Sequence, residues 1–247
     1  VVHIDEASMV DLQSMFRILT VFENRPLRLV FIGDWAQLAP VGIGLKYHKL
    51  VQSDAVPKAE LTINFRSNTA IVEAAEDIKK GITPETNETV QIIEYESTEQ
   101  LQELLQNQYY LNTYNDNEAH IIAARLKTVS ESNTALNRFL SKGCEVIRIT
   151  PQFRIGDKVI YKKNDKDLGL VNGSTGTVIG QAHDTMIVNF SIEGQATLTV
   201  EQIQNDPKGI YMLQHAYAMT CHSSQGSEFN VAIVVVENFA LVERHSR

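Results

Sequence analysis

Short apolar runs alternate with amphipathic stretches over the first 80 residues of the chain. The runs VVHI (1–4) and LRLVFIG (27–33) each end at polar residues, which is typical of buried strands in a parallel sheet. Between them, residues 9–22 carry apolar side chains at helical spacing, and this predicts a helix that packs on the core. Residues 68–80 predict a second helix. The pattern therefore indicates strands and helices that alternate around a parallel sheet.

The alternation continues beyond residue 80. Ser97, followed by Gln100 three residues later, is typical of the start of a helix. Residues 120–124 predict another buried strand, and residues 128–141 predict another amphipathic helix. The apolar run VAIVVV near the end of the sequence predicts one more buried parallel strand.

The segment between these parts has a different texture. Residues 149–200 are rich in β-branched side chains and are punctuated by Gly, Asn and Asp, and Asn172-Gly173 is a strong signal for a tight turn. We expect a small antiparallel barrel here, inserted into an α/β scaffold.

Composition narrows the class of protein. The 247 residues are 43% hydrophobic and 21% charged, which is typical of a globular domain, and no apolar run approaches the ~18–20 residues that span a membrane. Cys144 and Cys221 are too few for a disulfide framework or a zinc site, so we expect reduced thiols in a cytoplasmic protein. The net charge of −8 argues against a general polyanion binder, although a local basic groove is compatible with it.

Candidate chemistry begins where the first apolar run meets Asp5 and Glu6. Carboxylates at the carboxyl end of a buried parallel strand lie where α/β sheets bind ligands, and this order matches the Walker B pattern. In that pattern the aspartate holds the water shell of Mg²⁺, and the glutamate polarises the water that attacks the γ-phosphate. The alternative is that Asp5 or Ser8 simply caps the following helix.

Two further segments carry groups suited to a phosphate. Gln37 follows the second strand in GDWAQLAPVG, where a neutral amide would bond both the attacking water and a γ-phosphate oxygen. Arg66, in LTINFRSN, offers a planar and permanently charged fork. The alternatives are a polar turn after a strand and a surface salt bridge.

Taken together and in order, four segments resemble motifs of superfamily 1 helicases. DEAS resembles motif II, GDWAQLAPVG motif III, LTINFRS motif IV and YAMTCHSSQGSEF motif V. The resemblance is strongest to the RecD-like group, which includes exonuclease V alpha subunits and the helicase parts of conjugative relaxases. The segment GDKVIYKKNDKDLGLVNGSTGTV is similar to the SH3-like barrel of that group. Only residues from roughly 80 to 150 lack a specific motif.

The resemblance implies an α/β fold with two RecA-like parallel-sheet lobes, both incomplete, and an inserted SH3-like antiparallel β-barrel. Residues 1–80 would be the C-terminal part of the first lobe and 81–148 the first part of the second. Residues 149–200 would form the barrel, and 201–247 would return to the second lobe.

The resemblance also implies roles for individual residues. Asp5 would hold Mg²⁺, Glu6 would be the general base, and Gln37 and Arg66 would contact the γ-phosphate of ATP. Motif V would bind nucleotide and link its cleft to the DNA track through Gln225, Gly226 and Glu228. Single-stranded DNA would be contacted by Thr220, His222 and Ser223, and by a basic patch of Lys158, Lys162, Lys163 and Lys166.

Each DNA contact has a simpler alternative. Thr220 would be a helix cap, His222 a satisfied polar residue at a domain seam, and the lysines a solvated face. Ser223 stands where relatives commonly carry a lysine, which removes one expected phosphate contact.

The sequence also departs from the family. The phosphate-cradling loop G-x-x-x-x-G-K-[ST] is absent, and no Gly-Lys dipeptide occurs. The final arginine motif is not found either. We therefore expect a C-terminal piece of a longer helicase, inactive in isolation, that acts with other subunits of a recombination, repair or conjugation complex and contacts no membrane. The alternative is a non-catalytic nucleic-acid-binding or scaffold module.

Overall fold

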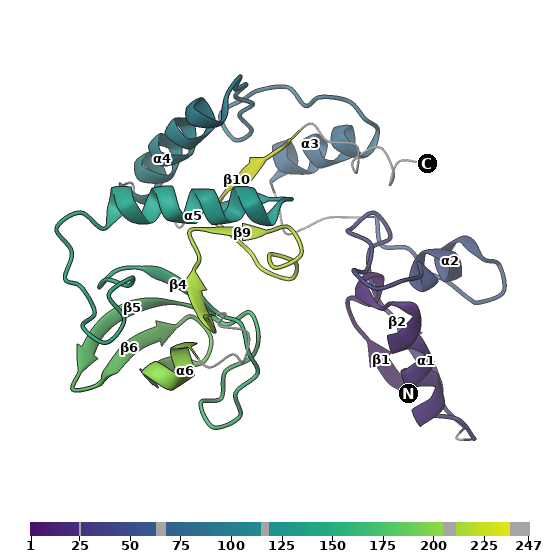
Figure 1. Ribbon diagram of the computed structural model, residues 1–247. Helices are drawn as coiled ribbons and strands as arrows, with labels where there is room; N and C mark the ends of the chain where they lie inside the picture. The colour runs from purple at the N-terminus through teal and green to yellow at the C-terminus, as the bar shows by residue number, and fades with distance from the viewer. Residues whose placement is uncertain (25, 63–67, 115–118, 205–210, 238–247) are drawn as a thin grey trace. The chain divides into compact units, whose positions relative to one another are not determined.

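The computed structural model describes residues 1–24, 26–62, 68–114, 119–204 and 211–237. The chain divides into two compact units, Val1–Glu94 and Tyr95–Arg247. Figure 1 shows the elements of each.

The first unit contains a two-stranded parallel sheet with helices. Val2 lies opposite Leu29, and Ile4 lies opposite Phe31. Its elements are β1 (Val2–Ile4), η1 (Ala7–Met9), α1 (Leu12–Val21), β2 (Leu29–Phe31), α2 (Lys46–Gln52) and α3 (Thr69–Lys79). The parallel strands and the helix between them lie where the apolar pattern predicted. The predicted packing of α1 on a core is not found, because Met15 is its one buried residue, whereas Leu12, Phe16 and Leu19 are exposed. A sheet of two three-residue strands offers this helix little surface to pack on.

The cap of α1 differs from the simpler alternative for motif II. The side chain of Asp11 accepts a hydrogen bond from the Ser14 N–H at 2.7 Å, so Asp11 is the N-cap of α1. Asp5 and Ser8 do not cap this helix, which leaves the Asp5 carboxylate without that structural duty.

The second unit is built on a three-stranded parallel sheet. Its strand order is β10-β3-β9, with Val231 opposite Ala119 and Ile121 opposite Ala218. The elements are α4 (Thr98–Tyr114), β3 (Ala119–Ala123), α5 (Leu126–Leu140), β9 (Ala218–Thr220) and β10 (Val231–Val235). Side chains from α4, α5 and the three strands form one hydrophobic core, the parallel-sheet core. As predicted, Ser97 accepts a hydrogen bond from the Gln100 N–H at the start of α4.

A five-stranded antiparallel sheet follows α5 and has a core of its own, the antiparallel-sheet core. Its strand order is β7-β6-β5-β4-β8. The elements are β4 (Lys158–Tyr161), β5 (Thr175–Ala182), β6 (Thr185–Phe190), β7 (Gly194–Thr199), α6 (Val200–Gln204) and β8 (Leu213–His215). The chain leaves beside the place where it enters, because the Ala216 N–H donates to the Lys158 carbonyl at 2.8 Å.

The closed SH3-like barrel predicted for residues 149–200 is not found. Within the residues that the structure describes, the edge strands β7 and β8 do not pair, so the sheet is open. The physical reason lies at both edges. The chain after β7 turns at once into α6, and β8 comes from beyond residue 200 and pairs with β4.

None of the described helices is long and apolar enough to cross a lipid bilayer.

Candidate nucleotide and nucleic-acid site

Motifs II and III lie together at one edge of the first sheet. The parallel pairing continues beyond the strand ends, since the Ile32 N–H donates to the Ile4 carbonyl at 2.9 Å and the Ala7 N–H donates to the Ile32 carbonyl at 2.8 Å. Asp5 and Glu6 therefore leave β1 next to the point where Asp34 leaves β2. This is the carboxyl edge, where α/β sheets bind their ligands.

Gly33 permits the close approach of the two motifs. A Cβ atom at this position would lie 3.1 Å from both the Ala7 and the Ser8 backbone nitrogen. Tyr47 also holds Gly33, because its hydroxyl donates to the Gly33 carbonyl at 2.6 Å. Burial raises the pKa of Tyr47, and the negative charge of Asp34 acts in the same direction, so this donor keeps its proton. No pattern in the sequence predicts the Tyr47 contact.

Glu6 has an unusual backbone. Its φ of 49° and ψ of 40° lie in the left-handed region, which few non-glycine residues adopt. The Glu6 N–H donates to Asp5 Oδ1 at 2.9 Å. Outliers of this kind gather at functional sites, where surrounding structure holds them in place.

The carboxylates suit Mg²⁺ that arrives with a nucleotide. Asp5 is exposed and Glu6 is half-buried, and only Oδ1 of Asp5 takes up the neighbouring N–H. Among the described residues, no group of three or more His, Cys, Asp or Glu side chains is arranged to hold a metal. Mg²⁺ needs no such cage, because it keeps several waters and binds through one or two carboxylates plus substrate phosphates. The residues present therefore fit Mg²⁺ bound with ATP.

Of the two other residues expected to contact the γ-phosphate, the structure describes Gln37 but not Arg66. Gln37 is exposed in the loop after β2, where its N–H donates to the Asp34 carbonyl at 3.3 Å. Its side chain thus belongs to motif III and is available to a ligand. Arg66 lies outside the described residues.

In the second unit, motif V (residues 217–229) contains β9 and continues beyond its end at Thr220. The Thr220 hydroxyl donates to Ser223 Oγ at 2.9 Å and accepts from the Ser223 N–H at 3.1 Å. This is a local cap, as in the simpler alternative for Thr220, although it caps a turn and not a helix. His222 and Ser223 have exposed side chains.

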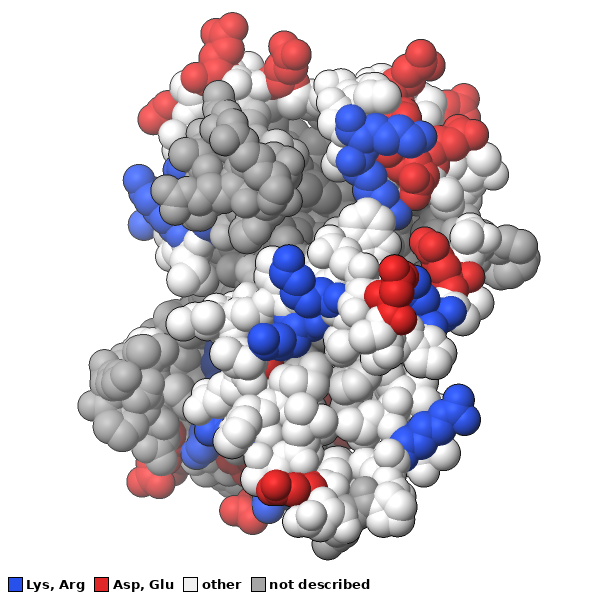
Figure 2. All heavy atoms as spheres, turned by 90° about the vertical axis from the view of Figure 1, so that its right-hand side faces the viewer, with Lys and Arg blue, Asp and Glu red and all other residues white. Residues whose placement is uncertain are grey.

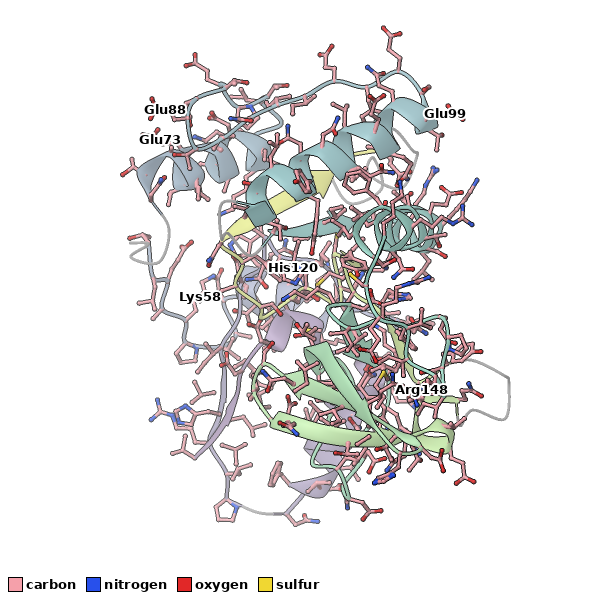
Figure 3. The ribbon with its side chains drawn as sticks, turned by 90° about the vertical axis from the view of Figure 1, so that its left-hand side faces the viewer. Lys58, Glu73, Glu88, Glu99, His120 and Arg148 are labelled. Atoms are coloured by element: carbon pink, nitrogen blue, oxygen red, sulfur yellow. The ribbon has the colours of Figure 1, made fainter. Side chains whose placement is uncertain are left out.

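The rest of motif V is tied to the parallel sheet at both ends. The Cys221 N–H donates to the Ala123 carbonyl at 3.1 Å. The Phe229 ring lies 4.6 Å from the ring of His120 on β3, which is labelled in Figure 3. Between these anchors, both polar atoms of the Gln225 carboxamide are shielded and have no hydrogen-bond partner among the described residues. Gly226 has a φ of 75°, and Glu228 is exposed.

The basic patch follows β4 in the antiparallel sheet. Lys163 and Lys166 are exposed, whereas Lys158 and Lys162 are half-buried. Burial lowers the pKa of Lys162, so its environment differs from that of a fully solvated lysine. Figure 2 shows acidic and basic side chains interspersed over the face it presents, with uncharged areas between them. Neither sign of charge predominates on that face.

Comparisons with known proteins agree with the motifs. A family model described as AAA domain matches residues 1–104. The probable conjugal transfer protein TraA of Sinorhizobium fredii is 24% identical over 239 residues, which are 91% of this chain and 21% of that protein. The ATP-dependent RecD2 DNA helicase of Deinococcus radiodurans is 27% identical over 241 residues, which are 94% of this chain and 32% of that protein.

A solved structure shares the fold. The Pif1 helicase from Bacteroides in complex with ADP-AlF3 and ssDNA has a TM-score of 0.59 at 19% identity, over 96% of this chain and 64% of that one. The chain spans only about a fifth of the TraA relative and about a third of the RecD2 relative. In sequence the chain is thus similar to a RecD2 DNA helicase and to a conjugal transfer protein TraA, and in fold it is similar to a Pif1 helicase.

Proposed function

We propose that this chain is the part of an ATP-dependent DNA helicase or translocase of the RecD-like type that carries motifs II to V. It would couple ATP hydrolysis to movement along single-stranded DNA. The observation that carries the proposal is the meeting of motifs II and III at one sheet edge, where Gly33 lies against the backbone of Ala7 and Ser8.

The chemistry follows from the groups at that edge. The exposed Asp5 carboxylate would bind the Mg²⁺ of the nucleotide, which supplies charge neutralisation at the phosphates. Glu6 would accept the proton of the attacking water, and Gln37 would orient that water by hydrogen bonding. Arg66 would contribute its charge to the γ-phosphate.

The second unit would carry the DNA. The phosphate backbone of DNA would be contacted by Thr220, His222 and Ser223, and by the lysines at 162 and 163. Gln225, Gly226 and Glu228 would link this segment to the nucleotide. The support is that a structural neighbour was solved with ssDNA and that a relative is named a DNA helicase. On this proposal, residues 1–80 belong to the first RecA-like lobe. Residues 81–148 and 201–247 belong to the second lobe, and residues 149–200 form the insertion.

The setting is proposed on the same basis. One relative is named a conjugal transfer protein and another the RecD subunit of the RecBCD enzyme, so we propose that the chain works with other subunits in conjugation, repair or recombination. The free thiols Cys144 and Cys221 are in keeping with the cytoplasm.

The test is DNA-stimulated ATP hydrolysis by a protein that joins this chain to a phosphate-binding loop. We expect hydrolysis that rises when an oligothymidylate is added. Binding of that DNA without any hydrolysis would favour the alternative, a non-catalytic nucleic-acid-binding or scaffold module. Binding of neither ligand would exclude both.

The DNA contact has a separate test. We expect Lys163→Ala to weaken oligothymidylate binding and to lower the slope of log affinity against log salt by about 0.7, the value for one lost phosphate contact on a single strand. Lys127→Ala is the matched control, because Lys127 lies on α5 and pairs with Glu131 at 3.7 Å. Equal slopes for the two variants would remove Lys163 from the DNA contact.

A further inference from the structure

A buried carboxylate joins the two cores of the second unit. Asp157 is 1% exposed and immediately precedes β4. The antiparallel-sheet core contains Phe153, four residues earlier, and the parallel-sheet core contains Tyr217. A buried charge is costly unless every lone pair is bonded, so the partners of Asp157 show what it holds together.

Asp157 has four hydrogen-bond partners. Oδ1 accepts from the Tyr217 hydroxyl at 2.7 Å and from the Asn137 amide at 3.1 Å. Oδ2 accepts from the Arg154 N–H at 2.8 Å and lies 3.1 Å from His215 Nε2, which donates to it when that nitrogen carries the proton. The partners lie on α5, on β8, in the loop before β4 and at the residue before β9, so one carboxylate contacts all four segments.

Aromatic rings follow the same route between the cores. The His215 ring lies 4.8 Å from Phe153 on one side and stacks on Tyr217 at 6.1 Å and 13° on the other. Tyr217 in turn meets Tyr109 of α4 edge-on at 5.8 Å. Burial raises the pKa of Tyr217 strongly, and the charge of Asp157 adds to the effect, so its hydroxyl remains a donor.

Helix α5 clamps the adjoining strand. Asn133, one turn before Asn137, donates to the Ala218 carbonyl at 2.9 Å and accepts from the Ala218 N–H at 2.9 Å. Two asparagines on one face of α5 thus hold the start of β9 and the Asp157 carboxylate together. Strand β9 is only three residues long and leads directly into Cys221 and the rest of motif V.

The other end of the connection is the basic patch. Strand β4 runs from Lys158 to Tyr161, so it starts after Asp157 and ends before Lys162. A displacement at Lys162 would pass along this paired strand to Asp157, then through the Tyr217 hydroxyl to β9. No flexible loop interrupts this path.

We propose that Asp157, Asn137, His215 and Tyr217 form a positioning cluster that couples the antiparallel sheet to motif V. The DNA part of this inference rests on the proposed function. DNA bound at the lysines after β4 would change the position of the segment from Thr220 to Gln225 through this cluster. These residues touch neither nucleotide nor DNA, and they act through the segments that do.

The test compares two buried tyrosines of the second unit by hydrogen exchange in the 247-residue chain. Tyr217→Phe removes one bond to Asp157 but keeps the ring. Tyr161→Phe is the matched control, because Tyr161 is also fully buried and its hydroxyl binds Asp165 at 3.4 Å and the Gln202 carbonyl at 3.3 Å, away from the cluster. We expect Tyr217→Phe to speed exchange of the motif V amides by about tenfold, as expected for a lost hydrogen bond to a charged group, with the antiparallel-sheet core unchanged.

Asp157→Asn is the second variant, because it keeps the shape of the side chain and removes its charge. It should reproduce the local effect of Tyr217→Phe. Unchanged exchange at motif V in both variants, or equal acceleration in Tyr161→Phe, would overturn the positioning role and leave a purely structural network.

Oligothymidylate supplies the second arm of the experiment. In the wild-type chain, bound oligothymidylate should slow exchange at motif V. In Tyr217→Phe it should bind with similar affinity and protect motif V less. Full protection in the variant would overturn the coupling. Failure of the wild-type chain to bind would instead overturn the DNA contact of the proposed function, and the exchange comparison without DNA would still decide the positioning role.

Discussion

Glu6, for which we propose the role of general base, has a backbone conformation that glycine would adopt more easily. A non-glycine residue in the left-handed region costs on the order of 1 kcal/mol, and this cost is met here by the buried turn that follows, Ala7 and Ser8. Such a site would retain this strained backbone because it needs the glutamate side chain at this position.

At this position Glu6→Gln tests the base directly. In the ATPase that carries the chain, we expect hydrolysis to fall by roughly 100-fold or more, since an amide keeps the shape but cannot accept the proton of the water. Nucleotide affinity should stay nearly unchanged. Steady-state hydrolysis and equilibrium nucleotide binding measure the two effects.

Glu73→Gln is the control for this variant. Glu73 is an exposed glutamate on α3 of the same unit and is labelled in Figure 3. Its replacement should leave hydrolysis intact. A Glu6→Gln variant that hydrolyses within about threefold of wild type would remove Glu6 from the base role.

Gly33→Ala tests the contact between the motifs. The added methyl would lie 3.1 Å from two backbone nitrogens, so motif III must shift by a few tenths of an ångström. Because small misplacements of reacting groups are costly, we expect turnover to fall about tenfold or more. Gly180→Ala is the comparison, since a Cβ there meets nothing within 4 Å. Unchanged turnover in Gly33→Ala would show that the close approach is not needed.

At the scale of the elements, the pKa of Tyr161 on β4 makes the stability of the antiparallel sheet depend on pH. Burial raises the pKa of Tyr161 to about 12 from an ordinary 10.0, and the charge of Asp165 and the hydrogen bond to it act in the same direction. The folded protein therefore favours the neutral phenol. The stability that this contributes is fully present below pH 10 and is lost as the pH rises through about 12.

Tyr161→Phe should reveal this loss. Between about pH 10 and about pH 12, wild type should lose roughly 2 kcal/mol of unfolding free energy more than the variant, because the phenol titrates near 10 in the unfolded chain and at about 12 in the folded one. Denaturant unfolding at a series of pH values, followed on the antiparallel sheet, measures it. Parallel pH profiles for the two proteins would contradict the assignment.

The elements also show what a pattern along one chain reveals. Apolar runs and helical spacing predicted β1, β2, β3, β10 and the helices α1, α3 and α5, because periodicity follows secondary structure. The burial expected from the same pattern is confirmed for β3 but was wrong for α1, where Leu12, Phe16 and Leu19 are exposed. Barrel closure was wrong, because it depends on whether distant edge strands meet, and a pattern along one chain does not record that.

Turn-forming residues predicted one tight turn of the antiparallel sheet but not another. Gly173 has a φ of 107° and lies in a turn closed by the Ser174 N–H and the Val171 carbonyl, as the Asn172-Gly173 signal predicted. The tight connection between β5 and β6 uses instead His183 at a φ of 51°, a residue that gives no such signal.

The candidate sites divide in the same way. Asp5, Glu6 and Gln37 follow strands, so their common edge could be expected from chain order alone, while their chemical roles stay predictions. The partners of Asp157 could not be expected, since Asn137, His215 and Tyr217 lie 20, 58 and 60 residues away in sequence. Only the folded chain brings such residues together.

At the scale of the whole molecule, the missing phosphate-cradling loop has a direct consequence. We expect the 247-residue chain alone to hydrolyse ATP negligibly, with or without oligothymidylate, because no segment of its sequence matches that loop. A phosphate-release assay at high protein concentration measures this. DNA-stimulated turnover by the chain alone, abolished in Glu6→Gln, would contradict the expectation.

The neighbouring positions of Lys158 and Ala216 bear on how such a molecule arises. The antiparallel sheet leaves its host beside the point where it enters, so a short linker would span the same gap with little loss of chain entropy. Ancestral genes could gain, lose or exchange this segment while β3, β9 and β10 stay paired. Relatives would then diverge most in the inserted sheet and least in the scaffold that receives it.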